Sequence, residues 1–235
     1  FTPPSQNFRC EIVAAETVIY GDSVEVDWGD GSPSEIVSIP TNHVYTGFPD
    51  AKLTVTIKGF VKGISGDGVN KPFIYIYSEG GMYSAETVRI DYSMPIEYFG
   101  NTAFYGSLIG DLSFITPSVT NFGVSCFEHT RLSSLIGMPS GITKIPDMCF
   151  ADAQAITSLA GLSPSVTTIG ERAFMGASYL TSLNGFPASV IYLGDECFNG
   201  CSRLADLSGM SASVITTVPN GCFMGTGIRS LVGLP

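Results

Sequence analysis

A phenylalanine recurs along the second half of the chain at a nearly constant interval. It stands at positions 104, 127, 150, 174, 198 and 223, so successive copies are 23, 23, 24, 24 and 25 residues apart. The surrounding sequence repeats in register. The stretch from Ser165 to Ala188, SVTTIGERAFMGASYLTSLNGFPA, is followed at once by SVIYLGDECFNGCSRLADLSGMSA. Self-similarity at a period of this length is the signature of a repeat architecture.

Each repeat carries two short apolar segments, one on either side of this phenylalanine. The first contributes an apolar residue five positions before it: Phe99, Phe122, Ile145, Ile169, Leu193 and Val218. The second contributes a pair that begins five or six positions after it: Ile109/Leu112, Leu132/Leu135, Ile156/Leu159, Leu180/Leu183, Leu204/Leu207 and Ile228/Leu231. So small a unit cannot bury both segments alone, so neighbouring copies must stack. The pattern predicts a solenoid with the phenylalanines in one internal column.

A glycine stands two residues beyond the second segment in five copies: Gly137, Gly161, Gly185, Gly209 and Gly233. Its position predicts a corner at which the backbone needs a positive φ or a close approach. The first copy has Phe114 in that place, and the last copy follows a one-residue insertion near Val214 to Val218. Such departures are expected in terminal copies, which cap a solenoid.

The combined pattern, L-x-x-L-x-G-x-P-x-S-V-x-x-I-G-x-x-x-F-x-G-C, resembles the BspA-like leucine-rich repeats of bacterial surface proteins. The resemblance covers about residues 95–235. It implies a non-catalytic, secreted or cell-surface protein that works by protein binding.

Residues 8–60 show a different pattern, with alternating apolar strands at 24–28 and 53–57 around the turn at 29–33. The strings VDWGDGS and HVYTGFPDAKLTVTIKG resemble the polycystic-kidney-disease-type (PKD-like) immunoglobulin-like domain. We therefore expect a mainly β protein. An immunoglobulin-like β-sandwich (1–60) is followed by bridging strands or a diverged capping repeat (61–95) and by a leucine-rich-repeat solenoid of about six 23–25-residue repeats (96–235).

Charge and hydropathy limit the partners. The net charge is −10 and the eleven lysines and arginines are scattered, so no basic surface for nucleic acid is expected. No window approaches the roughly 18 apolar residues of a membrane span, so we expect no transmembrane segment. We expect a monomer in an extracellular or cell-surface location. Because the sequence opens abruptly at Phe1 and stops partway through a repeat, we expect its export signal or lipid anchor to lie outside it.

The six cysteines are predicted to be free structural thiols. Four of them, Cys126, Cys149, Cys197 and Cys222, directly precede the repeated phenylalanine, where the other copies have Ala103 and Ala173. The position therefore takes a small buried side chain. Cys201 shares its place with Ala153 and Ala177, and Cys10 has no evident partner. A bridge between Cys126 and Cys149 is the alternative, although parallel side chains in a ladder rarely meet the dihedral requirement of a disulfide.

The remaining chemical candidates are weak. His43 matches a structural position of the immunoglobulin-like family, and His129 lies alone in a turn. Asp22, Asp27, Asp30 and Asp50 are candidate calcium ligands, but a turn in which Asp30 bonds to backbone amides is the plainer interpretation. No motif for a nucleophile, a phosphate loop or paired carboxylates stands out. We expect that the protein is not an enzyme and that it binds no metal and no cofactor.

What remains is the surface of the solenoid, with two columns of exposed side chains as candidate ligand contacts. One column holds Ser133, Thr157, Thr181, Ala205 and Arg229, and the other holds Asn121, Lys144, Thr168, Tyr192 and Thr217. The leading hypothesis is adhesion to host or other-cell proteins, with an extracellular protein or glycan as ligand. The alternatives are a glycan-binding accessory module, which would need exposed aromatic rings, and a structural scaffold of the cell envelope.

Overall fold

The structure is a computed structural model. It describes residues 7–12, 24–27, 32–37, 41–46, 54–58, 63–64, 74–78, 81–83, 87–90, 96–107 and 109–235, and before residue 96 it describes the side chains of residues 25–27 and 32–36 only. The strands are β1 (Asn7–Ile12), β2 (Val24–Asp27), β3 (Glu35–Val37), β4 (Thr41–Thr46), β5 (Thr54–Lys58), β6 (Gly63–Ile64), β7 (Ile74–Ser78), β8 (Gly81–Tyr83), β9 (Thr87–Ile90), β10 (Tyr98–Phe99), β11 (Asn121–Phe122), β12 (Lys144–Ile145), β13 (Thr168–Ile169) and β14 (Tyr192–Leu193). One 3₁₀-helix, η1, spans Ser208–Met210.

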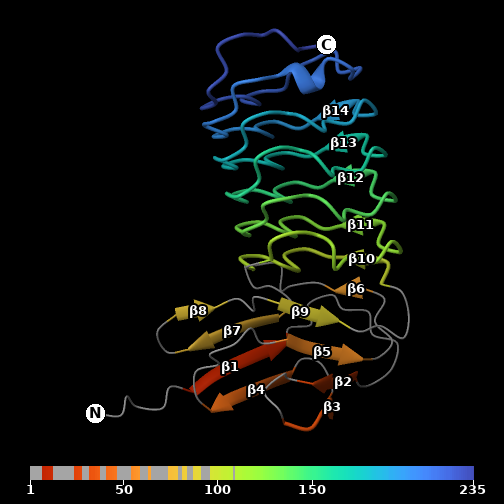
Figure 1. Cartoon of the computed structure of the whole chain (residues 1–235), viewed down its shortest axis with the longest axis vertical. Coiled ribbons are helices and arrows are strands. Elements are labelled where there is room, and N and C mark those ends of the chain that lie inside the picture. Colours follow the sequence, from red (N-terminus) through yellow and green to blue (C-terminus); the bar gives the residue numbers. More distant parts are fainter. Residues whose placement is uncertain are drawn as a thin grey trace.

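From β10 onward the chain forms a stack of similar coils, as the repeat predicts (Figure 1). Each of the first five coils, or rungs, contributes one two-residue strand. β12, β13 and β14 pair in parallel and in register, so that Lys144 lies beside Thr168 and Thr168 beside Tyr192. β10 pairs in the same way with β11. The stacking of repeats, with parallel strands along one side, is thus confirmed.

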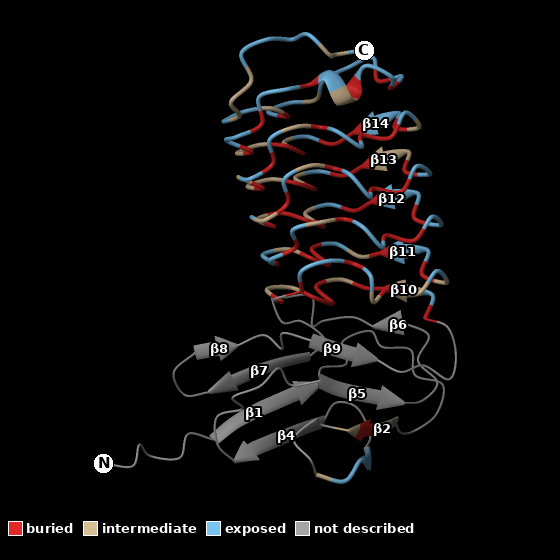
Figure 2. Cartoon of the chain, in the orientation of Figure 1, coloured by how far each residue is buried: buried red, intermediate tan, exposed pale blue. Residues whose placement is uncertain are grey.

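The repeated phenylalanines, one from each rung, form a continuous column of stacked rings, which we call the spine. Their ring centroids are 5.2, 5.4, 5.3, 5.5 and 5.8 Å apart from Phe104 to Phe223, and all five pairs are stacked. Phe127, Phe150, Phe174 and Phe198 are fully buried. Burial is confined to the inside of the coil along its whole length (Figure 2). The predicted internal column is therefore confirmed.

Backbone hydrogen bonds link each rung to the next through the turn that carries the spine. The backbone N–H of each spine phenylalanine donates to the carbonyl of the residue that precedes the next spine phenylalanine. These bonds run from Phe104 to Cys126, Phe127 to Cys149, Phe150 to Ala173, Phe174 to Cys197 and Phe198 to Cys222, at 2.8 to 3.0 Å. Two residues before the spine the backbone is left-handed in every rung: Thr102, Ser125, Met148, Arg172, Glu196 and Gly221, with φ from 52° to 61°. A left-handed non-glycine residue costs about 1–2 kcal/mol. The ladder offsets that cost by pairing the backbone groups of the turn.

The corner glycines behave as predicted. Gly137, Gly161, Gly185 and Gly233 have φ between 91° and 102°. A Cβ on Gly161 would also lie 2.5 Å from the Ile136 nitrogen, on the rung before. Gly209 is needed for close approach alone, because it lies within η1 and faces the Leu183 carbonyl.

A hydrogen bond from the backbone to a short side chain also stabilises the turn at each corner. One serine or aspartate per rung accepts a hydrogen bond from the backbone N–H two residues later: Asp111, Ser134, Ser158, Ser182, Asp206 and Ser230, at 2.8 to 3.5 Å. Such short side chains fix a turn by binding their own backbone. The pKa of Asp111 is lowered by hydrogen bonds from the hydroxyl and then the backbone N–H of Ser113, and that of Asp206 by hydrogen bonds from the backbone N–H and then the hydroxyl of Ser208.

The strands before residue 96 form two four-stranded sheets, in the orders β4-β1-β7-β8 and β3-β2-β5-β9. The pairs β1–β4, β2–β3 and β2–β5 are antiparallel, whereas β9 is parallel to β5. β6 pairs in parallel with β10 and so adds one strand to the sheet of the coil (Figure 1). The immunoglobulin-like character of residues 1–60 stays a prediction.

The last repeat departs from the expected burial. Val218, placed by the pattern among the inward residues, is 49% exposed, and Leu231 is 71% exposed. Within the stretch of the inserted residue, Ile215 is buried whereas Val214 is 62% exposed.

We expect Gly161→Ala to destabilise the solenoid by about 2–4 kcal/mol, because it combines left-handed strain with a backbone collision. Gly110→Ala is the matched control, since its Cβ would meet nothing within 4 Å, and it should change stability by less than about 0.5 kcal/mol. Urea unfolding of both variants, followed by circular dichroism, measures the difference. Equal midpoints would contradict the assignment of the corner.

The spine gives a second prediction. Phe150→Ala should cost about 3–5 kcal/mol, because it removes a buried ring with a stacked neighbour on each side. Phe223→Ala should cost roughly half as much or less, since that ring is only partly buried and has a single stacked neighbour, 5.8 Å away. The same unfolding measurement compares the two, and an equal loss would show that stacking is not what holds the rungs.

Candidate functional site

The two predicted columns lie on the outside of the stack. The first holds Ser133, Thr157, Thr181, Ala205 and Arg229, and the second holds Asn121, Lys144, Thr168, Tyr192 and Thr217. All are exposed except Thr168, which is half-buried. Their role as ligand contacts stays a prediction, but their surroundings separate them into two kinds.

Several hydroxyl groups in and beside these columns bind the preceding rung. Ser133 Oγ donates to the carbonyl of Gly110 at 3.1 Å, and Thr181 Oγ1 donates to that of Thr157 at 3.1 Å. Thr167, next to Thr168, makes the same bond to Thr143 at 3.2 Å. These hydroxyl protons therefore hold neighbouring rungs together, which gives Ser133 and Thr181 a structural role.

The strand face, which we define as residues 120–121, 143–144, 167–168 and 191–192, offers a different chemistry. Half of its eight side chains are threonines, whereas Ile191 is 65% exposed and Tyr192 is 57% exposed. Lys144 lies two strands away in the same register, with Thr168 between it and Tyr192. The strand face thus combines a local apolar spot with a nearby cation.

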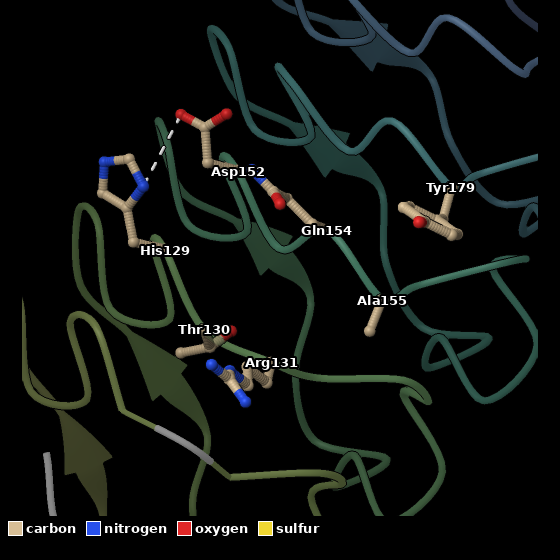
Figure 3. Close-up of a pocket in the computed structure, with 7 residues that line it drawn as sticks. All are labelled: His129, Thr130, Arg131, Asp152, Gln154, Ala155 and Tyr179. Atoms are coloured by element: carbon tan, nitrogen blue, oxygen red, sulfur yellow. Dashed lines mark ion pairs between the residues drawn. The ribbon is translucent and has the colours of Figure 1, made fainter.

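A cavity of about 550 Å³ opens on another side of the stack, after the spine phenylalanine (Figure 3). We call it the Ala155 notch. It is lined by His129, Thr130, Arg131, Asp152, Gln154, Ala155 and Tyr179, which come from three successive rungs.

Ala155 creates the notch by interrupting a column of large side chains. Arg131, Ala155, Tyr179 and Arg203 each directly precede the first leucine or isoleucine of the second apolar segment. The Arg203 guanidinium lies 4.1 Å from the centroid of the Tyr179 ring, so these two rungs are in contact. Between Arg131 and Tyr179 the methyl group of Ala155 fills little of the space.

Two residues beside the notch take the place of a glycine. Four rungs have Gly106, Gly176, Gly200 and Gly225 two positions after the spine, with φ from 66° to 74°. His129 and Asp152 occupy the same position with φ of 58° and 53°. His129 Nδ1 lies 3.8 Å from Asp152 Oδ2, as Figure 3 shows. The ring of Tyr105 meets that of His129 edge-on, and burial, followed by the charges of Glu128 and Asp152, raises the pKa of Tyr105.

The sequence contained a signal for the notch, although no motif describes it. Only a comparison of equivalent positions shows that Ala155 interrupts a column of large residues. The same comparison shows that His129 and Asp152 replace glycine. The three departures lie within 27 residues of one another and reach one cavity because the stack brings successive rungs together.

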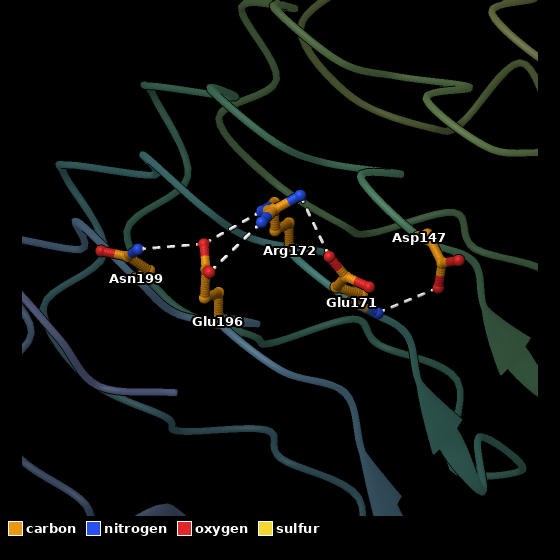
Figure 4. A network of polar contacts seen from close by, with 5 residues as sticks. All are labelled: Asp147, Glu171, Arg172, Glu196 and Asn199. Atoms are coloured by element: carbon orange, nitrogen blue, oxygen red, sulfur yellow. Dashed lines mark hydrogen bonds and ion pairs between the residues drawn. The ribbon is translucent and has the colours of Figure 1, made fainter. Parts of the chain in front are cut away.

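A network of polar side chains elsewhere on the stack forms its hydrogen bonds and ion pairs among its own members (Figure 4). Arg172 Nε and Nη2 donate to the two carboxylate oxygens of Glu196 at 2.9 and 3.2 Å, and Arg172 Nη1 lies 3.0 Å from Glu171 Oε1. Asn199 adds a bond to Glu196, and Asp147 accepts the N–H of Glu171. The bonds from Arg172 lower the pKa of Glu196, and the bond to Glu196 raises that of Arg172. The network links adjacent rungs at the surface, where ion pairs contribute little to the stability of the fold.

The profile of the "BspA type Leucine rich repeat region" matches residues 74–157 and 120–233, in six copies. The chain belongs to the BspA-type leucine-rich-repeat family. The match begins upstream of residue 96, where the sequence analysis expected the solenoid to start. It gives no support to the PKD-like resemblance of the first sixty residues.

Two solved structures give partial matches. A leucine-rich repeat protein from Bacteroides ovatus ATCC 8483 is 21% identical with a TM-score of 0.46, over 79% of this chain and 44% of that one. A T. pallidum leucine rich repeat protein is 21% identical with a TM-score of 0.46, over 80% of this chain and 86% of its own. The chain therefore spans less than half the length of the B. ovatus protein. A search of curated proteins found no match.

Membership of the BspA-type family carries general properties. Leucine-rich-repeat proteins generally mediate protein binding, and this family is typically non-catalytic. BspA-type proteins are typically found at the cell surface or outside the cell. Among the residues that the structure describes, no helix is long and apolar enough to cross a membrane.

The other candidate groups of the BspA-type chain fall mostly outside the described residues. This applies to Asp22, Asp30 and Asp50, and to the side chains of His43 and Cys10. Within the described part, no three histidine, cysteine, aspartate or glutamate side chains gather in a way that would hold a metal ion. A calcium site at the aspartates stays untested.

Five cysteines, Cys126, Cys149, Cys197, Cys201 and Cys222, are buried and free, which confirms the prediction for these positions. The sulfur atoms of Cys197 and Cys222, on adjacent rungs, are 3.3 Å apart, and Cys201 Sγ donates to the Phe174 carbonyl at 3.2 Å. Burial raises the pKa of Cys126, Cys149 and Cys197, and that of Cys201 to about 12. Both the burial and the scarcity of thiolate make them inert.

We therefore expect a Cys10→Ser variant to react with a chromogenic disulfide reagent at pH 8 at least roughly 1,000-fold more slowly than glutathione. The substitution removes the one thiol outside the described part. In urea all five remaining thiols should titrate at the rate of free cysteine. Rapid reaction of any thiol in native buffer would contradict the burial of these thiols between the rungs.

Proposed function

We propose that this BspA-type chain is a non-catalytic adhesion protein that binds a protein partner on another cell through its strand face. The observation that carries the proposal is the exposed pair Ile191 and Tyr192 on that face. The family supports it, since leucine-rich-repeat proteins generally mediate protein binding. An extracellular or cell-surface location is part of the proposal.

The energetics of interfaces favour this position. Tyrosine is enriched among the few residues that carry most of the binding free energy, because its large, rigid ring loses little conformational entropy on contact. Tyr192 lies in a parallel sheet whose register is fixed by neighbouring rungs, so its backbone is already ordered before binding. Preorganisation of this kind raises affinity. Threonine side chains lie around it on the strand face and supply polar groups for the rim of such an interface.

A second candidate function, glycan binding, is favoured by a separate observation. The sequence offered Tyr192 alone as an exposed aromatic ring in the two columns, but the structure adds Tyr179, which is 46% exposed and lines the Ala155 notch.

We expect wild-type protein to bind at least one member of a panel of immobilised extracellular-matrix proteins and mucins, and Tyr192→Ala to weaken that binding about 30-fold, the effect of losing about 2 kcal/mol at a hot spot. Because the side chain is largely exposed, the thermal unfolding of the variant should match that of wild type. Surface plasmon resonance with the full chain measures the affinities.

Ile136→Ala is the control. Ile136 is 65% exposed, close to the 57% of Tyr192, but it lies at a corner, away from the strand face. It should retain wild-type affinity. Failure to bind any panel member, or an equal loss in both variants, would contradict the proposed function.

A further inference from the structure

We propose that the Ala155 notch binds one pyranose ring of a glycan, with Tyr179 as the stacking surface. The inference does not depend on the strand face, because the notch lies after the spine phenylalanine of each rung and the strand face lies before it.

The spacing of the rungs sets the thickness of the slot. Spine rings of the three rungs concerned, Phe127, Phe150 and Phe174, are 5.4 and 5.3 Å apart. Arg131 and Tyr179 stand two rungs apart, or roughly 10 Å at the spacing of neighbouring strands. A ring held at the level of Ala155 would then lie about 5 Å from each. That gap accommodates a puckered sugar ring, whose C–H bonds would point at the aromatic face.

One face of Tyr179 is open to the slot. Arg203, from the following rung, covers the other face at 4.1 Å from the ring centroid. The guanidinium holds the ring in place by a cation–π contact. The open face looks toward the preceding rung, where Ala155 leaves space, and both residues line the cavity.

The polar side chains favour a sugar over an apolar side chain of a protein. Among the described residues, the side chains of Arg131, Gln154 and Tyr179 show no hydrogen bond or ion pair. Together with Asp152 they supply both donors and acceptors around the slot. Neighbouring hydroxyls of a pyranose donate and accept in the same way, whereas a bound aromatic or aliphatic side chain would leave these groups unpaired. The volume, about 550 Å³, lies in the range of small-ligand sites.

The departures from the repeat are concentrated here at a cost in backbone strain. His129 and Asp152 hold left-handed conformations that four other rungs give to glycine. Such conformations are strained and persist only where the surrounding structure imposes them. The carboxylate of Asp152 lies against Gly176, in the space that a Cβ there would need, so Gly176 makes room for it. The side chains that carry this strain are the ones that border the slot.

The test uses the full chain and the methyl pyranosides of glucose, galactose, mannose, N-acetylglucosamine and glucuronic acid. Saturation-transfer NMR and titration should show at least one of them binding with a Kd on the order of 1 mM, as expected for a ligand of this size. Ala155→Tyr should weaken that binding at least 10-fold, because it fills the slot with a residue that the same column already holds at Tyr179. Thermal unfolding should show that this variant remains folded.

Three further variants complete the test. Ala188→Tyr adds the same side chain at an exposed position outside the notch and outside both columns, and should leave binding unchanged. Tyr179→Ala should lose binding, whereas Tyr179→Phe should retain most of it, because the stacking face is kept. The proposal is overturned if no glycoside binds at about 20 mM, or if Ala155→Tyr and Tyr179→Ala bind as wild type does. Tyr192→Ala should leave glycoside binding intact, so that failure here and failure of the strand-face proposal are told apart.

Discussion

The backbone hydrogen bonds that run from each rung to the next set the geometry on which the rest of the molecule depends. The bond from each spine phenylalanine to the carbonyl of the following rung, at 2.8 to 3.0 Å, holds equivalent atoms about one strand spacing apart. Identical rings at that spacing must stack, and they do, at 5.2 to 5.8 Å. The residue before each ring is enclosed between rungs, so only alanine or cysteine stands there. The buried thiols are therefore a consequence of the ladder and have no chemical role of their own in it.

The same ladder turns each position of the repeat into a column on the surface, and a column acts differently when one member departs from it. The hydroxyls of Ser133 and Thr181 follow the pattern and bind the neighbouring rung. Ala155 breaks a column of large side chains and opens a cavity. Ile191 and Tyr192 break a column of polar residues and expose apolar surface. Both candidate sites thus arise from exceptions to the repeat, while the repeat itself supplies a rigid support.

The sequence predicted the features that depend on the period and missed those that depend on context. The phenylalanine spine, the buried cysteines and the corner glycines follow from spacing and residue size, which are visible in one dimension. The left-handed position before the spine was invisible because Thr102, Met148 and Arg172 carry no glycine signal there. Val218 was placed among the inward residues by the period alone, yet it is 49% exposed. The notch was missed because it is defined by an absent side chain, and its lining comes from three rungs.

A stack of this kind also fixes how two sites relate to each other. The strand face and the Ala155 notch lie on different sides of the same rungs, and no flexible loop separates Tyr179 from Tyr192, since both belong to one continuous ladder of backbone bonds. Two sites held at a constant separation raise each other's effective concentration only for a ligand that spans them in that geometry. A glycoprotein whose sugar and polypeptide match the spacing would gain this advantage, and a free glycan or a bare polypeptide would not. The rigidity that the phenylalanine spine provides is thus itself a source of selectivity.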